Sequence, residues 1–139
     1  MKRRYWMLSL LVVMAGYLLT PIPSTAFLYR NAAVLEGKVE SLKGASFGIG
    51  LDPAYYYKFT ISPGDIDITI AALGLGLSAH AEYELAVMQR DGPLFWNAWW
   101  WRPARTAGSV LYSGYVAGNI FYLLYDRDSQ VAYLYIQNT

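Results

Sequence analysis

The chain has 139 residues, of which 55% are hydrophobic, 17% aromatic and only 15% charged. This composition is typical of a folded chain, and the length suits one domain with a short appendage. Eleven basic and ten acidic residues give a net charge of +1, without the basic surplus of a nucleic-acid binder, and no nucleic-acid partner is expected. The absence of cysteine and the single histidine exclude disulfide scaffolds, thiol catalysis and multi-histidine metal sites, so no cofactor is expected.

Residues 1–26 have the layout of a secretory signal peptide. Three basic residues at 2–4 precede an uncharged run at 7–19, and the small residues at 24–26 favour cleavage after Ala26. The alternative is an uncleaved signal anchor, because residues 5–22 provide about eighteen mostly apolar positions, the lower limit for crossing a bilayer. Both interpretations predict an extracellular or cell-surface location for the rest of the chain.

Residues 27–139 show short β-rich runs separated by turn residues, which predict an all-β domain: a single antiparallel β-sandwich of about seven to nine strands. A loop is expected at 43–50, and tight turns are expected at 62–65 and 126–129. The run 80–89 also has helix propensity, but its alternating charge favours a strand. The predicted strands lie at 34–42, 55–61, 66–70, 82–87, 110–115, 120–125 and 131–136.

Alternation along these runs predicts which side chains fill the interior. A shift of one residue in register would bury charged side chains such as Lys58 or Glu84 instead. The last two runs are almost continuously apolar and aromatic, so both of their faces are expected to be covered. The predicted interior residues are Tyr57, Phe59, Ile68, Ile70, Leu85, Val87, Tyr122, Leu124, Tyr133 and Tyr135.

Several of these runs, taken in order, resemble one known family. The run Tyr55–Asp65 with Ile66–Ile70, the segment Glu84–Gly92, and the pair Gly118–Tyr125 and Ala132–Ile136 resemble the bacterial pre-peptidase C-terminal domain. The resemblance covers about residues 34–137 and implies a jelly-roll-like sandwich in an exported protein, working as an accessory module without catalysis. A tryptophan-rich insert at 95–105 departs from the family pattern.

Two short motifs match catalytic or cofactor-binding patterns, but the secondary structure that these patterns require around them is not predicted. Residues 44–48 match G-x-S-x-G around Ser46, but no helical pattern follows the serine, as a nucleophile elbow requires. Residues 74–79 match G-x-G-x-x-A, but the repeated βαβ units of a dinucleotide fold are missing. His80 has no recognisable partner base. The sequence therefore predicts no enzyme and no catalytic residue.

Two acidic pairs are weak calcium candidates. Asp65 and Asp67, and likewise Asp126 and Asp128, are spaced two residues apart in or beside expected turns, as oxygen ligands of calcium sites are. Neither pair lies in an EF-hand loop, and solvated turn aspartates explain both, so no metal site is predicted.

The tryptophan-rich insert is the feature with most functional content. Four of the five tryptophans fall within six residues, and alternation cannot hide three consecutive indoles on one face. Three interpretations stay open: an aromatic edge of the core, an interface with a protein partner, or contact with a glycan or with lipid headgroups. The candidate contact residues are Phe95, Trp96, Trp99, Trp100, Trp101, Arg102 and Arg105.

The sequence therefore favours an exported, non-enzymatic domain at the cell surface that acts as a structural or assembly subunit. Self-association or contact with another surface protein is expected through aromatic residues and strand edges, including a weak strand near 32–42. A polysaccharide-binding module that uses the tryptophans is one alternative. An accessory subunit of a membrane complex, held by an uncleaved N-terminal helix, is the other.

Overall fold

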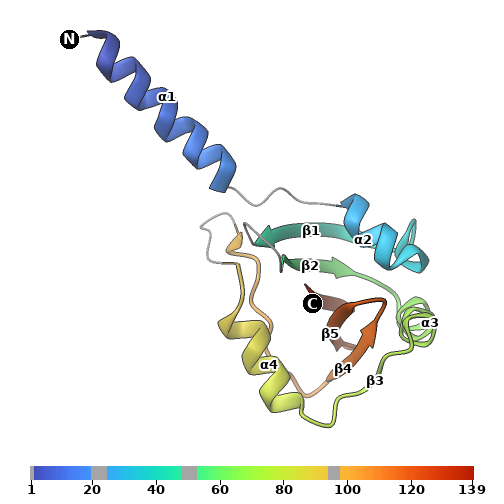
Figure 1. Ribbon diagram of the computed structural model, residues 1–139. Helices are drawn as coiled ribbons and strands as arrows, with labels where there is room; N and C mark the ends of the chain where they lie inside the picture. Colours follow the sequence, from blue (N-terminus) through green and yellow to red (C-terminus); the bar gives the residue numbers. More distant parts are fainter. Residues whose placement is uncertain (1, 20–24, 48–52, 94–97) are drawn as a thin grey trace.

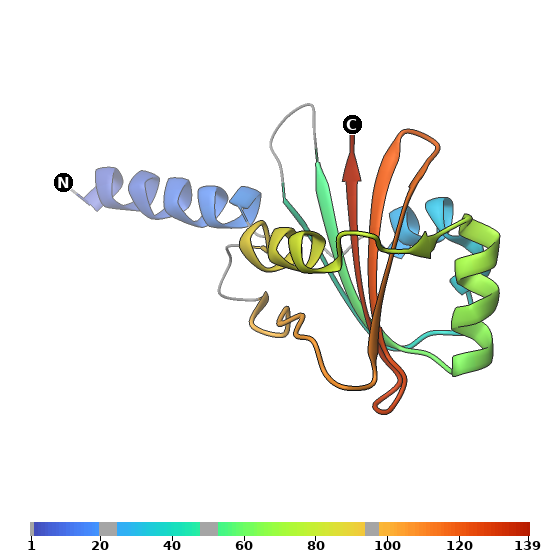
Figure 2. The ribbon, with the colours of Figure 1, turned by 90° about the horizontal axis from the view of Figure 1, so that it is seen from below.

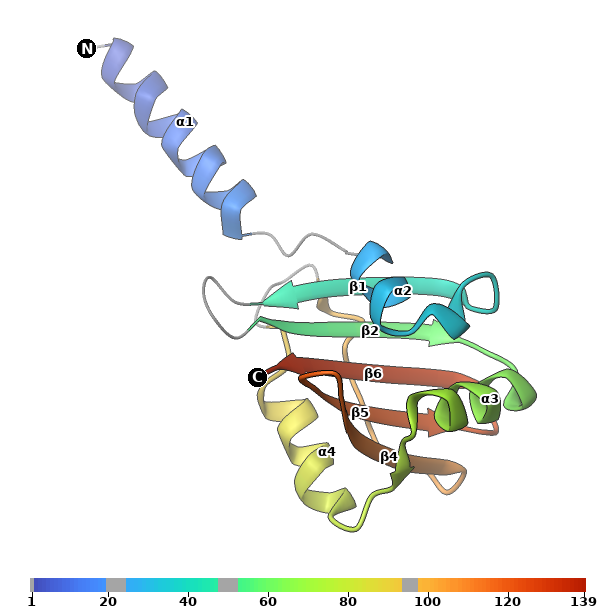
Figure 3. The ribbon, with the colours of Figure 1, turned by 45° about the vertical axis from the view of Figure 1, so that its right-hand side comes forward.

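The computed structural model describes residues 2–19, 25–47, 53–93 and 98–139. The strands are β1 (Glu40–Phe47), β2 (Ala54–Thr60), β3 (Gly76–Leu77), β4 (Ser109–Val116), β5 (Asn119–Asp126) and β6 (Val131–Asn138). They form one antiparallel sheet in the order β1-β2-β6-β5-β4-β3 (Figures 1 and 3). The predicted antiparallel sheet is confirmed, but the described residues form one sheet of six strands together with helices, instead of the expected all-β sandwich of seven to nine strands.

Helices cover both faces of this sheet (Figure 2). Helix α2 (Thr25–Asn31), the 3-10 helix η1 (Ala33–Leu35) and helix α3 (Pro63–Leu73) pack on one face, called here the α3 face. Helix α4 (Ala81–Arg90) and the segment 98–106 pack on the other, the α4 face. The expectation that both faces of the last two strands are covered is confirmed.

The predicted strand at 66–70 is wrong, because these residues belong to α3. The Ser62 side chain accepts a hydrogen bond from the Asp65 N–H at 3.2 Å, and Pro63 occupies the first turn, as is typical of a helix start. Gly74 ends the helix in the left-handed conformation, with φ of 66°. The residues that predicted a turn at 62–65 therefore begin a helix instead.

The predicted strand at 82–87 is also wrong, because these residues lie within α4. Glu82 and Glu84 stand in its first turn and Arg90 in its last, which is the charge order that a helix dipole favours. Leu85 and Met88 are three residues apart and both point into the core of the α4 face. Helix propensity, together with this buried face, outweighs the charge alternation.

The N-terminal part of the domain also departs from the prediction. Instead of a strand at 34–42, the chain forms η1 and turns at Gly37, with φ of 74°, before β1 begins at Glu40. The expected loop at 43–50 is β1 as far as Phe47, and the remaining residues of that loop lie outside the described residues. The strands predicted at 55–61, 110–115, 120–125 and 131–136 are confirmed in type, each within one or two residues at its ends.

Alternation in β2 matches the prediction and divides the core into two clusters. Tyr57 and Phe59 point to the α3 face, and Tyr56 points to the α4 face. Most predicted interior residues are buried or half-buried, but Ile68 is 52% exposed on the outer side of α3. Those confirmed as buried are Tyr57, Phe59, Leu85, Val87, Leu124 and Tyr135, while Ile70, Tyr122 and Tyr133 are half-buried.

Helix α1 (Lys2–Leu19) extends away from the sheet (Figure 1), and its side chains from Trp6 to Ala15 are exposed. Within the part of the chain that the structure describes, no helix combines the length and the apolar character needed to cross a membrane.

Candidate binding surface

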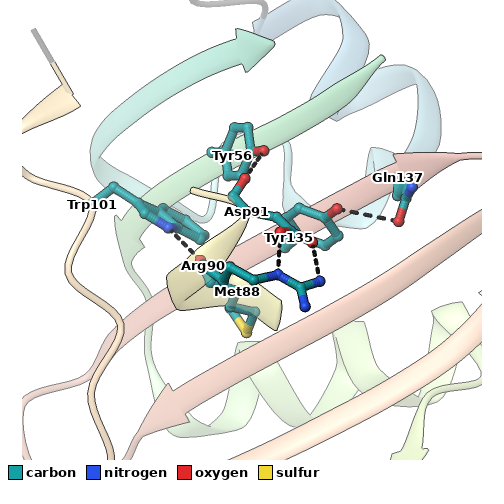
Figure 4. A network of polar contacts seen from close by, with 7 residues as sticks. All are labelled: Tyr56, Met88, Arg90, Asp91, Trp101, Tyr135 and Gln137. Carbon is teal, nitrogen blue, oxygen red and sulfur yellow. Dashed lines mark hydrogen bonds and ion pairs between the residues drawn. The ribbon is translucent and has the colours of Figure 1, made fainter. Parts of the chain in front are cut away.

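Trp101 belongs to the core of the α4 face. It is 9% exposed, and its ring meets Tyr56 and Tyr133 edge-on, with centroids 5.1 and 5.6 Å apart. Its indole N–H donates to the Met88 carbonyl oxygen at 2.9 Å (Figure 4). Because Met88 lies in the last turns of α4, this bond fastens the irregular segment to the helix and leaves neither polar group unpaired.

A second group of polar contacts fixes the end of α4 over the sheet (Figure 4). The Tyr56 hydroxyl donates to the Asp91 carbonyl oxygen, and the Asp91 carboxylate pairs with Arg90 at 2.6 Å. This hydrogen bond to Arg90 lowers the pKa of the Asp91 carboxyl. Burial raises the pKa of the Tyr56 hydroxyl well above its usual value and that of Tyr135 to about 12, so both stay protonated at neutral pH.

The neighbouring tryptophans divide between core and surface. Trp100 is 8% exposed and packs edge-on against Trp101, whereas Trp99 is 67% exposed. The Lys43 ammonium lies 4.8 Å from the centroid of the Trp99 ring, a cation–π contact. The core interpretation of the insert is therefore correct for Trp100 and Trp101 and wrong for Trp99.

The other candidate contact residues of the insert lie around this boundary. Arg102 is exposed next to the buried pair, and Arg105 is exposed and bonded to Glu82 at the start of α4. Phe95 and Trp96 lie outside the described residues.

Two basic residues that the sequence did not single out lie on the same face as Trp99. Lys43 in β1 is the register partner of Lys58 in β2, and Lys58 is the register partner of Tyr133 in β6. The Lys58 ammonium lies 5.2 Å from the Tyr133 ring centroid. Lys43, Lys58, Trp99, Arg102 and Tyr133 are called here the Trp99 surface.

A groove of about 190 Å³ continues this surface toward the β5–β6 turn. Lys58, Arg102 and Tyr133 form one part of its wall, and Asp126 contributes a carboxylate. Thr106 and Ser129 also line it, so the groove is formed by both charged and polar residues.

A second groove, of about 250 Å³, lies between α4 and strands β3 to β5. Leu85, Leu111 and Leu124 give it an apolar wall, and Arg105 lies at its rim with its charge already paired to Glu82. This groove therefore offers no free charge to a ligand.

Three of the four calcium candidates, Asp65, Asp67 and Asp126, have carboxylates that already bond to other groups. Asp65 accepts from the Ser62 hydroxyl at 2.8 Å and lies 3.4 Å from Lys38, and the Ser62 bond lowers its pKa. Asp67 pairs with Arg127 at 2.9 Å. Asp126 accepts from the Asp128 N–H and from the Ser129 hydroxyl, which lowers the pKa of its carboxyl. No group of three or more His, Asp or Glu side chains suited to a metal occurs among the described residues.

Ser46 and His80 lie at opposite edges of the sheet. Ser46 is in the edge strand β1, and His80 lies between the opposite edge strand, β3, and α4. Five strand spacings of about 4.8 Å separate these two edges, so the serine and the histidine cannot form a catalytic pair.

No protein-family model matches the chain, and no curated protein or solved structure is significantly similar to it. Two segments that carry the resemblance to the pre-peptidase C-terminal domain, 66–70 and 84–87, are helical in the structure. That resemblance, and the jelly-roll-like sandwich that it implies, stay predictions.

Proposed function

We propose that this chain is an exported, non-enzymatic domain that binds a polysaccharide on the Trp99 surface. The observation that carries the proposal is the 67% exposure of Trp99 directly beside two buried tryptophans. Tryptophan is enriched among the residues that dominate binding energies, and Trp99 lies next to the charged groups of the same surface. The flat face of an indole suits the apolar face of a sugar ring, while nearby polar groups bind its hydroxyls.

The location of the packing boundary supports export. Thr25 and Ala26 are exposed, Phe27 is half-buried, and Leu28 is fully buried on the α3 face. Phe27 stacks on Tyr55 with centroids 3.5 Å apart. Packing against the sheet thus begins directly after the expected cleavage site, so removal of residues 1–26 would leave the domain core whole.

The positions of Ser46 and His80 support a non-enzymatic role. Hydrolytic catalysis would need a nucleophile such as Ser46 next to a base such as His80. In the structure, roughly the whole width of the sheet separates these two residues. The Trp99 surface offers ammonium, guanidinium and aromatic groups, which suit binding.

The proposal is tested by affinity electrophoresis of the protein in gels that contain a panel of neutral and acidic polysaccharides. We expect retardation by at least one polysaccharide and its loss in Trp99→Ala. The matched control is Tyr115→Ala, which removes an aromatic side chain that is 68% exposed on β4. Equal migration in every gel, with or without Trp99, would overturn the proposal.

A second candidate function, assembly with further copies, is favoured by β1. This strand is at the edge of the sheet and pairs only with β2 among the described residues. Residues 44–47 carry no charge and no proline, the usual protections of an edge. Lys43 and the irregular register between Glu40 and Lys43 protect only the first half of the strand. Sedimentation velocity at micromolar concentrations tests this candidate, and a monomer at every concentration would exclude it.

A further inference from the structure

The basic residues of the domain divide into paired and unpaired groups. Residues 27–139 contain eight Lys and Arg. Lys38, Arg90, Arg105 and Arg127 each pair with a carboxylate. Of the remaining four, Arg30 lies on α2. The other three have no described carboxylate within ion-pair distance. These three are Lys43, Lys58 and Arg102, all part of the Trp99 surface.

This concentration of unpaired charge is costly for the fold. Lys43 and Lys58 are direct register partners on neighbouring strands, and like charges opposite each other destabilise a sheet. The domain as a whole has ten acidic and eight basic residues, a net charge of −2. A cationic cluster on an anionic domain is therefore a local feature, and a bound anion would relieve its repulsion.

We propose that the polysaccharide bound on this face is acidic, with sugar carboxylates held by Lys43, Lys58 and Arg102 and a sugar ring stacked on Trp99. This inference rests on the function proposed above. The Lys43 and Lys58 ammonium groups lie over the rings of Trp99 and Tyr133, 4.8 and 5.2 Å from the ring centroids. Because the Lys43 ammonium lies over one face of the Trp99 ring, a sugar would stack on the opposite face, with this cation close to its carboxylate.

The composition of the 190 Å³ groove distinguishes between types of anionic polymer. Asp126 lines the groove together with Lys58 and Arg102, and its carboxylate is held by the Asp128 N–H and the Ser129 hydroxyl. This fixed negative charge opposes a densely sulfated or phosphorylated chain. It accepts hydrogen bonds from sugar hydroxyls, so one carboxylate per hydroxyl-rich ring, as in a polyuronate, fits the mixture best.

The test uses the full chain and compares polygalacturonate with its methyl ester, with neutral dextran and with dextran sulfate. We expect the affinity for polygalacturonate to exceed that for the ester and for dextran by about tenfold or more, and to fall steeply when salt screens the charges. The double variant Lys43→Gln/Lys58→Gln should lose most of this affinity while keeping its fold, because it removes a repulsion. The matched control is Lys38→Gln, whose ammonium pairs with Asp65 of α3 and should not affect binding.

Each other outcome overturns the inference in a recognisable way. Binding of neutral and acidic polymers alike, lost only in Trp99→Ala, would refute the carboxylate sites and leave the polysaccharide function standing. Tighter binding to dextran sulfate would refute the preference for carboxylates. Lysine-dependent binding to vesicles of phosphatidylglycerol and phosphatidylcholine, without binding to any polysaccharide, would show that the ligand of this surface is a lipid headgroup and would refute the polysaccharide. Binding to no probe would overturn the proposed function as well.

Discussion

Replacing Trp101 by alanine should destabilise the fold far more than the same change at Trp99. Truncation of a buried tryptophan costs about 3–5 kcal/mol. The Met88 carbonyl, which accepts the indole N–H at 2.9 Å, would also lose its partner, at about 1–3 kcal/mol where water does not replace it. We therefore expect Trp101→Ala to lower the free energy of unfolding by roughly 4–8 kcal/mol, a large share of a small domain's stability.

Two further variants separate the contributions. Trp99→Ala loses an exposed ring and one cation–π contact with Lys43, which together should cost no more than about 1 kcal/mol. Trp101→Phe keeps most of the ring contacts with Tyr56 and Tyr133 but removes the N–H donor. Its cost should be about 1–3 kcal/mol, between the other two.

The measurement is equilibrium urea unfolding followed by far-ultraviolet circular dichroism, because tryptophan fluorescence changes with the substitution itself. All three free energies are extrapolated with the slope fixed by the parent protein. Equal losses for Trp99→Ala and Trp101→Ala would refute the division of the insert into a buried and an exposed part. A cost below about 2 kcal/mol for Trp101→Ala would refute its place in the core.

Three other expectations follow from the same packing. Phe59→Ala should cost about 3–5 kcal/mol by urea unfolding, because Phe59 is 1% exposed in the core of the α3 face; a loss near zero would contradict its register. Burial raises the pKa of the Tyr135 hydroxyl to about 12 in the folded protein, while in the unfolded chain it is near 10. The buried neutral hydroxyl therefore contributes its full share to the stability below about pH 10, and this share is lost as the pH rises toward about 12. Tyr135→Phe should flatten this alkaline loss in a pH series of urea midpoints, and an unchanged slope would contradict the assignment. Gly92→Ala should destabilise the domain, because the added Cβ would lie 2.7 Å from the Trp101 ring. Gly64→Ala in α3 adds a Cβ into open space and should be neutral or stabilising. Melting temperatures in the reverse order would contradict this geometry.

The strands could be predicted where one local pattern dominates. In β2, aromatic residues alternate with Lys58 and Thr60, and the register follows because a slip would bury the lysine. Strands β5 and β6 are continuous apolar runs joined by a short polar turn, so their type is equally clear. None of these assignments depends on residues far away in the sequence.

Helix α3 shows why the other assignments failed. Ile66, Ile68 and Ile70 alternate and are β-branched, so the local pattern predicts a strand. The helix instead buries Ile66, Thr69 and Leu73. Thr69 is a polar residue whose hydroxyl donates to the Asp65 carbonyl oxygen at 2.8 Å, four residues earlier. A buried threonine satisfied by its own helix is invisible to a pattern that counts apolar positions.

The candidate site was predictable only in part for a related reason. The tryptophan-rich insert was identified from composition, but which indole reaches water depends on contacts with Tyr56, Tyr133 and Met88 in distant elements. Lys43 and Lys58 lie fifteen positions apart in the sequence, and only the register of β1 against β2 makes them neighbours. Such long-range pairing cannot be derived from periodicity within either run.

In the proposed binding surface, the position of the exposed tryptophan depends on the packing of the buried one. The segment 98–106 has no strand and little helix of its own, so on its own it would not hold an indole in one place. Trp101 supplies this support through its bond to Met88 and its contacts with Tyr56 and Tyr133. Trp99, two residues earlier, is thereby presented beside Lys43 at a fixed position, and a ligand that stacks on it need not pay for ordering the segment. The core interpretation and the binding interpretation of the insert are therefore compatible, because the packing of Trp101 holds the exposed Trp99 in one position where a ligand can stack on it.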